Sequence, residues 1–305
     1  MKRRTRLQPE RSKASQVLVV GSMSVALLAA VSVPSDAQRK ASEIGSVSQT
    51  VDGTVMTMEY YRPVARGRDP LFGKVVRWGT TWTPGANWAT TFEADKDIQV
   101  NGNPLPKGKY AIWMIPRESE DWTVIFHKKA RAFHVDRPRG TEEEQLRFTV
   151  KAEQGMHMET LTWYFPVVGP DGATLRMHWG TTFVPLQISI RPTVVAAHLD
   201  SSERAVYFGS YSFEADWAKG AQLEVSDSAG RIIASVKSPT MTDGPRFDLV
   251  PLGDHRFRTG YAMGGHVVDL SGSSTVVFTV EEGKVKSFEM LDGNGKVEAR
   301  GMRTP

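Results

Sequence analysis

The 305-residue chain contains no cysteine. This absence excludes disulfide bonds, thiolate metal sites and a cysteine nucleophile, and it also excludes lipid attachment through cysteine. The folded chain must therefore be stabilised by hydrophobic cores, and 305 residues are enough for about two of them.

Net charge is also missing from most of the chain. The whole sequence carries a formal charge of +4, and residues 1–37 alone hold six Lys and Arg against two Asp and Glu, which is again +4. Residues 38–305 therefore sum to zero. The argument from overall charge for a nucleic-acid or anionic-membrane partner therefore disappears for the mature chain, and we predict no nucleic-acid partner.

The first 37 residues have the pattern of a secretory signal peptide. A basic start precedes an apolar run at residues 17–31, and small residues lead to a cleavage position after Ala37. The run is short for a membrane span and is interrupted by glycine and serine. We therefore predict an exported protein, periplasmic or extracellular, with no transmembrane segment in the mature chain. An uncleaved N-terminal anchor is the alternative, and Arg3-Arg4 leaves twin-arginine export open.

Helical periodicity is absent between residues 38 and 190, where alternating apolar and polar residues predict strands instead. Asp52-Gly53 and Asn101-Gly102 are strong signals for two-residue hairpin turns. In the segment 109–115, apolar residues occupy both faces of the expected strand, which is typical of a central strand covered on both sides. The fold class predicted is all-β, an antiparallel β-sandwich followed by a small antiparallel β-barrel or meander.

The composition changes near Arg191-Pro192. Seven of the eight tryptophans precede this point, and beyond about residue 200 the strands are shorter and separated by glycine-containing turns, which favours a small barrel or meander. The expected organisation is a signal peptide at 1–37, a β-sandwich domain at 38–191, a linker at 192–203 and a small β-barrel-like domain at 204–305.

One long irregular stretch, Tyr60 to Thr91, organises the first half of the chain. It holds three tryptophans, four arginines and a Gly-Ala-Asn turn. We call it the organising loop and expect it to fold over the mouth of the sandwich, because long ordered loops in compact domains are usually functional.

Two arginines of the organising loop are candidate ligand-binding residues. Arg62 and Arg68 can bind a carboxylate, phosphate or sulfate in a bidentate manner. Alternatively, they bond carbonyl groups of their own loop, which ordered loops require. In either case we expect both side chains to be ordered and at least partly buried.

Three further residues are candidates for the same role. Asn87 lies in a sharp turn and either contacts a ligand or caps the turn itself. Trp88 directly follows that turn and is the tryptophan most suited to stack on a sugar or a heterocycle, whereas Trp78, Trp82 and Trp113 are expected in the core. His127 ends a strand beside a basic segment, Lys128 to Gly140, which either receives an acidic partner or is a solvated loop.

The turn at Gly169–Gly172 predicts a strand register. A three-residue loop would place Trp163 opposite Trp179, Phe165 opposite Met177 and Val167 opposite Leu175, with apolar side chains paired across the strands. Arg176 and His178 would then point away from the main core.

Residues of about 40–190 resemble the bacterial domain of unknown function 2911. The motifs that carry the resemblance are Arg62-Pro63, Gly67-Arg68, Phe72-Gly73, Trp82, Gly85-Ala86-Asn87, Thr90, Asn101-Gly102, Gly108-Lys109-Tyr110 and Trp122-Thr123-Val124. The resemblance implies an exported β protein and no established activity. Thr83 and Trp88 stand where the family often has an arginine and an acidic residue, so polar chemistry shared at this turn is not carried over.

Residues of about 204–305 resemble, less specifically, the small β domains appended to secreted bacterial hydrolases. Tyr207 to Tyr211, Gly230, Phe257 and Phe278 to Met290 carry this likeness, which supports a barrel and transfers no activity.

The function expected is that of a non-enzymatic periplasmic or cell-envelope binding module. Its partner is an unidentified small molecule or envelope component, and no cofactor or metal site is predicted, since no histidine pair has zinc-ligand spacing. The alternative is a hydrolase or isomerase acting on an envelope sugar or peptide. That activity would require Arg62, Arg68, Asn87 and His127 to converge on one cleft with a carboxylate.

Overall fold

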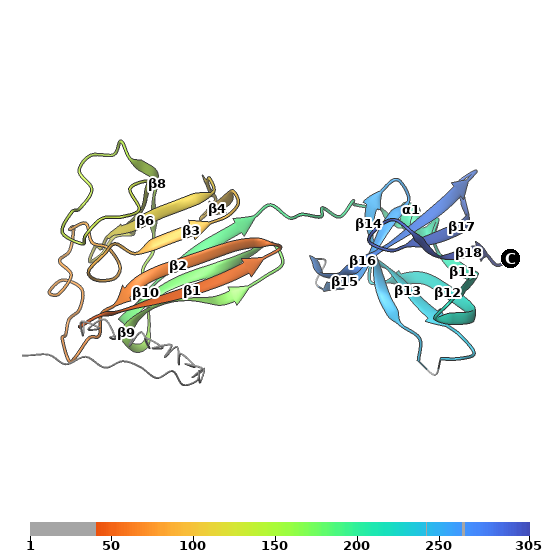
Figure 1. Cartoon of the computed structure of the whole chain (residues 1–305), viewed down its shortest axis with the longest axis horizontal. Coiled ribbons are helices and arrows are strands. Elements are labelled where there is room, and N and C mark those ends of the chain that lie inside the picture. Colours follow the sequence, from red (N-terminus) through yellow and green to blue (C-terminus); the bar gives the residue numbers. More distant parts are fainter. Residues whose placement is uncertain (1–40, 242, 264–265) are drawn as a thin grey trace, which may run out of the picture. The chain divides into compact units, whose positions relative to one another are not determined.

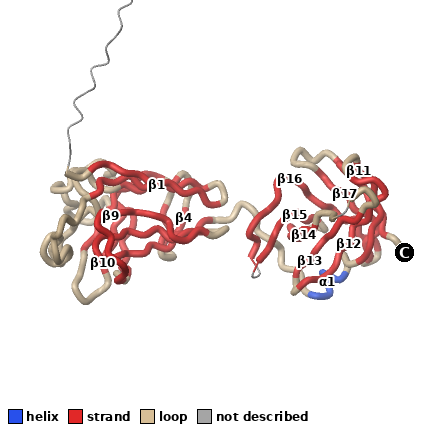
Figure 2. The backbone as a smooth tube through the Cα atoms, turned by 90° about the horizontal axis from the view of Figure 1, so that it is seen from below, coloured by secondary structure: helices blue, strands red, loops and turns tan. Residues whose placement is uncertain are grey.

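The computed structural model describes residues 41–241, 243–263 and 266–305 (Figure 1). The predicted signal peptide lies outside the described residues. Strands dominate the described part, and the helix assigned within it is α1 (Ser201–Ala205), coloured blue in Figure 2. The all-β prediction is confirmed. Among the described residues, no helix has the length and apolar composition of a membrane span.

A six-stranded antiparallel sheet forms one layer of the sandwich. Its strands, in spatial order, are β1 (Glu43–Val51), β2 (Thr54–Arg62), β3 (Thr91–Ala94), β6 (Gly108–Ile115), β7 (Trp122–His127) and β8 (Glu144–Val150). Asp52 and Gly53 join β1 to β2 with φ of 42° and 67°, the left-handed backbone that a tight hairpin turn needs. The predicted turn is therefore confirmed.

The second sheet has the order β5 (Asn103–Leu105), β4 (Ile98–Val100), β10 (Gly172–Ile190) and β9 (Glu153–Val168). Asn101-Gly102 connects β4 to β5, again with two positive φ angles. β10 folds back on itself near Gly180, which has φ of 61°. As a result the Ile190 N–H donates to the Asp171 carbonyl at 2.9 Å, and the side chains of Thr174 and Gln187 are hydrogen bonded at 2.9 Å.

The main core lies between these two sheets. Side chains alternate along β6, so that Ile112 and Met114 face this core while Ala111 and Trp113 face the opposite side of the sheet. All four are buried, as the sequence predicted for a strand covered on both faces. The larger inward residues of the second sheet include Trp163, Met177 and Trp179.

The register of β9 with β10 differs from the prediction. Val168 pairs with Ala173 and Val167 with Thr174, and a register shift then places Trp163 opposite Met177 rather than Trp179. The irregularity after Thr174 keeps Trp163 and Met177 on the core face, because a β-bulge corrects the phase of the side chains. The predicted three-residue loop is also wrong, because the Gly169 N–H donates to the Gly172 carbonyl at 2.8 Å and only Pro170 and Asp171 remain in the turn.

The predicted orientation of the β10 side chains is confirmed. Leu175, Met177 and Trp179 belong to the main core, whereas Arg176 and His178 lie on the other face. His178 is nevertheless buried there, beside Phe183, and its Nε2 donates to the Met156 carbonyl at 2.9 Å. This burial lowers the pKa of His178, which favours the neutral ring.

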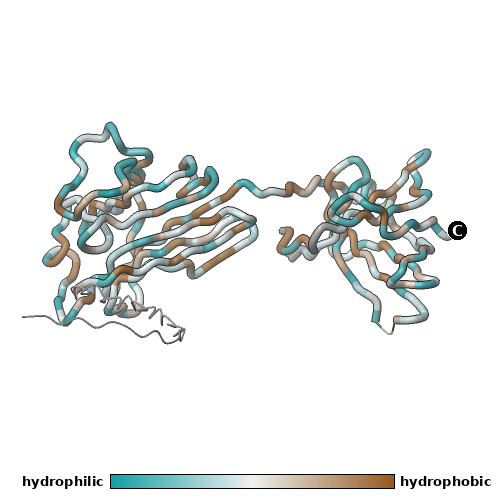
Figure 3. Tube along the Cα trace, viewed as in Figure 1, coloured by the Kyte–Doolittle hydropathy of each residue, from teal (hydrophilic) through white to brown (hydrophobic). Residues whose placement is uncertain are grey.

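The second half of the described chain forms a closed antiparallel barrel. The strands follow one another in order around the barrel: β11 (Gly209–Ala215), β12 (Ala218–Ser228), β13 (Arg231–Lys237), β14 (Arg246–Gly253), β15 (Arg256–Met263), β16 (His266–Glu281), β17 (Lys284–Leu291) and β18 (Val297–Arg303). β18 returns to pair with β11. Apolar and polar residues alternate along these strands (Figure 3), and the inward set makes a core of its own. The barrel prediction is confirmed.

Three residues of the segment predicted as linker are helical. Asp200 caps α1 by accepting from the Glu203 N–H at 2.9 Å, and the Glu203 carboxylate accepts from the Asp200 N–H at 2.7 Å. This reciprocal pair is a capping box. The helix is short because its five residues bury nothing.

Candidate functional site

The organising loop, predicted to cover the mouth of the sandwich, instead fills part of its core. Phe72 is buried, and its ring centroid lies 4.8 Å from that of Trp122 and 5.7 Å from that of Trp82. Trp82 stacks on Trp179 at 6.3 Å, and it forms an isolated β-bridge with Met114. The aromatic residues of the loop therefore pack into the core between the two sheets. Trp78 and Trp82 pack against this core, as expected from the sequence.

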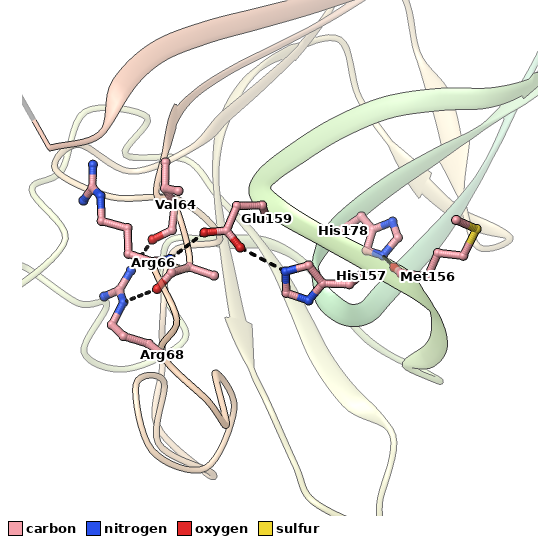
Figure 4. Close-up of polar contacts among 8 residues, drawn as sticks. Val64, Arg66, Arg68, Met156, His157, Glu159 and His178 are labelled. Atoms are coloured by element: carbon pink, nitrogen blue, oxygen red, sulfur yellow. Dashed lines mark hydrogen bonds and ion pairs between the residues drawn. The ribbon is translucent and has the colours of Figure 1, made fainter.

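The two candidate arginines of this loop bind protein carbonyl groups. Arg62 donates through Nη2 to the Thr162 hydroxyl at 2.9 Å and contacts the Leu161 carbonyl. Arg68 donates to the carbonyls of Ala65 at 2.9 Å and Val64 at 2.6 Å (Figure 4). Arg62 is half-buried, but Arg68 is exposed, so the prediction that both are partly buried is wrong for Arg68.

The neighbouring Arg66 fastens the same loop to β9. Its backbone N–H donates to the Glu159 carboxylate at 2.6 Å, and the other oxygen of Glu159 lies 3.0 Å from His157 Nε2 (Figure 4). The hydrogen bond from His157, followed by that from Arg66, lowers the pKa of Glu159. These contacts hold the organising loop against β9 of the same sandwich.

Asn87 is also hydrogen bonded to other residues of the protein. It adopts the left-handed conformation at φ of 58°, and its side-chain amide donates to the Ser42 carbonyl at 3.3 Å. Its own carbonyl accepts from the His134 N–H at 2.7 Å. The turn thereby connects the organising loop to the segment Lys128–Gly140, which we call the basic loop.

The basic loop covers the outer face of the six-stranded sheet. Ala89 N–H donates to the Ala132 carbonyl at 2.9 Å, and Trp88 forms a β-bridge with Phe133. Beneath them, Ala132 joins Ala111, Trp113 and Ile125 in a small separate core. This covering explains why both faces of β6 are buried, and it leaves a hollow on either side of the basic loop.

The first hollow, which we call the Trp88 hollow, has a volume of about 430 Å³. Trp88 is 37% exposed, the Arg131 guanidinium carbon lies 4.5 Å from its ring centroid, and Phe133 approaches it edge-on. Tyr61 and Thr91 line the same hollow. Its polar part is an ion pair of Lys109 with Glu59 at 3.7 Å. Aromatic rings next to charged and hydroxyl groups suit a ligand with both apolar faces and hydrogen-bonding edges.

The second hollow, which we call the His127 hollow, has a volume of about 590 Å³ and lies over Trp113. His127 is buried, its Nδ1 accepts from the Lys129 N–H at 3.2 Å, and its Nε2 is 3.9 Å from the Glu143 carboxylate. The neutral ring therefore carries its proton on Nε2. The remaining charged residues of the lining are Lys129, Asp136, Arg137 and Arg139.

The structure thus brings three of the five candidate residues to the basic loop and leaves two elsewhere. Asn87, Trp88 and His127 contact or flank the basic loop, whereas Arg62 and Arg68 contact β9 and the organising loop itself. Sequence reasoning missed Arg131 and Tyr61 as partners of Trp88. Glu59 and Tyr61 lie two residues apart on β2 and therefore share one face of the sheet, but no local signal in the sequence indicates that this face lies beside Trp88.

The described residues show no group of three or more His, Asp or Glu side chains placed to hold a metal ion.

Comparison with known proteins agrees with the motifs of the first half. Residues 42–188 match the family described as protein of unknown function (DUF2911), which supports the family assignment for the sandwich segment. No curated protein sequence matches the chain. The family description names no activity.

Proposed function

We propose that the protein is a non-enzymatic binding module of the cell envelope, and that its ligand is an envelope carbohydrate bound in the Trp88 hollow. The observation that carries the proposal is the exposed Trp88 ring beside Tyr61, Thr91 and the Lys109–Glu59 ion pair. A sugar presents apolar C–H faces that stack on aromatic rings and hydroxyl groups that bond carboxylate and ammonium groups. The hollow offers both kinds of contact on a rigid sheet.

Export forms part of this proposal and rests on the N-terminal signal pattern. The protein recovered from the periplasm or the medium should lack residues up to about Ala37, which mass measurement tests directly. Recovery of the full-length chain in a membrane fraction would contradict it. We place the sandwich and the barrel in separate domains joined at residues 192–203, and regard the barrel as an accessory domain because of its likeness to those of secreted hydrolases.

An enzymatic role receives less support from the geometry. His127 is the candidate base, yet its Nε2 lies 3.9 Å from the Glu143 carboxylate, beyond hydrogen-bonding distance for an orienting partner. Arg62 and Arg68 donate to protein oxygens near β9. The convergence that a hydrolase or isomerase would need is not formed by these residues.

Replacement of Trp88 tests the binding proposal. The mature protein is first screened by thermal shift against soluble envelope glycan fragments and, in parallel, envelope-derived peptides. For a glycan that binds, Trp88→Ala should weaken the Kd by about 10- to 100-fold, because an exposed aromatic platform is a typical binding hot spot. Isothermal titration calorimetry measures the change.

Trp217→Ala is the matched control, since Trp217 is 43% exposed and lies in the barrel half of the chain. Its Kd should stay within about twofold of the wild-type value. Equal losses in both variants, or binding of the peptides alone, would refute a carbohydrate site at Trp88.

A further inference from the structure

The His127 hollow contains features that the carbohydrate proposal does not use. Trp113 forms part of its wall and is fully buried, and within the described residues its indole Nε1 has no hydrogen-bond partner. A buried N–H without an acceptor is uncommon in native proteins and calls for a water, an ion or a ligand group. Trp113 and His127 are diagonal neighbours on one face, because Ala111 pairs with His127 and Trp113 with Ile125.

Positive charge gathers at the same hollow. Lys129, Arg137 and Arg139 contribute three positive charges to the lining, and Asp136 and Glu143 contribute two negative ones. Across the described residues, no ion pair occupies any of the three cationic side chains, whereas Glu143 already faces His127. Two guanidinium groups two residues apart can bind one oxyanion in a bidentate manner. The lining therefore carries three positive and two negative charges, and within the described residues none of the three cationic side chains is held in an ion pair.

We propose that the His127 hollow is a binding site for a small oxyanion, either a phosphate ester or a carboxylate. The anion accepts a hydrogen bond from His127 Nε2, and Arg137 and Arg139 hold it from the basic loop, while the buried Trp113 ring forms the wall beneath it. The volume of about 590 Å³ exceeds what a bare phosphate fills, so an organic anion is the fitting class. This site is separate from the Trp88 hollow and does not depend on the proposed carbohydrate function.

The indole N–H of Trp113 gives a readout specific to this site. The mature protein, labelled with ¹⁵N, is titrated at constant ionic strength with inorganic phosphate, glycerol 3-phosphate and citrate, and with sodium chloride as the reference. The expected result is a saturable shift of the Trp113 indole resonance with at least one oxyanion and none with chloride, because the ring lies in the wall of the hollow. A larger response to glycerol 3-phosphate than to citrate identifies a phosphate ester, and the reverse identifies a carboxylate. No saturable shift with any oxyanion, or an equal shift with chloride, would overturn the proposal.

The arginines provide a second, independent measurement. The double variant Arg137→Gln, Arg139→Gln should weaken the Kd of the anion at least tenfold by calorimetry, whereas Lys128→Gln should change it by less than twofold. Lys128 is exposed and is not among the residues that line the hollow, so it controls for general charge. Equal losses in both variants would show that only diffuse attraction is involved. Trp113→Phe assigns the indole signal, and if that variant does not fold, the calorimetric comparison alone decides.

Discussion

Phe72→Ala should lower the free energy of unfolding of the sandwich by about 3–5 kcal/mol, the range for removing a buried phenylalanine side chain. The Phe72 ring lies within 6.3 Å, centroid to centroid, of Trp78, Trp82, Trp122 and Trp179. Trp122 and Trp179 are held in the two sheets and Trp78 and Trp82 in the organising loop, so these four large neighbours cannot close the space that the ring leaves. Urea denaturation followed by tryptophan fluorescence measures the effect, because seven of the eight tryptophans precede residue 191 and so belong to the sandwich.

Val75→Ala is the control within the same loop. Val75 is 36% exposed, and its truncation should change the free energy of unfolding by less than about 0.5 kcal/mol. A loss below about 1 kcal/mol for Phe72→Ala would contradict the conclusion that the organising loop is part of the core. That result would instead support the expectation from the sequence, in which the organising loop only covers the mouth of the sandwich.

Arg231→Leu should destabilise the barrel by about 2–4 kcal/mol, because it removes the arginine partner of a buried carboxylate. Arg231 Nη1 lies 3.1 and 3.0 Å from the two carboxylate oxygens of Asp248, whose side chain is only 5% exposed. Hydrogen exchange of peptides from β12 to β14, measured by mass spectrometry on the whole chain, should accelerate accordingly.

The same barrel offers a matched surface pair. Arg300 Nε lies 2.7 Å from Glu289, but its side chain is 73% exposed, so Arg300→Leu should cost no more than about 1 kcal/mol. The two substitutions remove the same side chain from pairs of similar length. Similar exchange rates in the two variants would show that the burial of Asp248 does not govern the strength of its pair.

Local signals predicted the parts of the fold that depend on a few adjacent residues. Asp52-Gly53 and Asn101-Gly102 form the expected turns because only Gly, Asn and Asp readily adopt positive φ. Burial of both faces of β6 also followed from its composition. Asp200 and Glu203 were an equally local signal for α1, through the capping box, and went unrecognised because the segment was interpreted as linker.

The features that depend on distant residues could not be predicted in the same way. The register of β9 with β10 depends on a two-residue turn where a three-residue turn was predicted, and on an irregularity after Thr174 that shifts the pairing again. Likewise, the sequence indicated that something covers Trp113, but not that Ala132 of the basic loop does so. The candidate site arises from that long-range contact, which is why Trp88 was identified while Arg131, its stacking partner, was missed.

The closed barrel and the open sheets differ in what they offer to another chain. Every strand of the barrel has two hydrogen-bonded neighbours, since β11 pairs with both β12 and β18. The six-stranded sheet ends at β1, whose sequence EIGSVSQTV contains neither lysine nor proline, the residues that usually discourage further pairing at an edge. The exposed edge of the sandwich can therefore pair with an extended peptide or with the same strand of a second copy, whereas the barrel has no free edge for such pairing. An insertion or truncation that alters β1 consequently carries a greater risk of aggregation than one in a barrel strand.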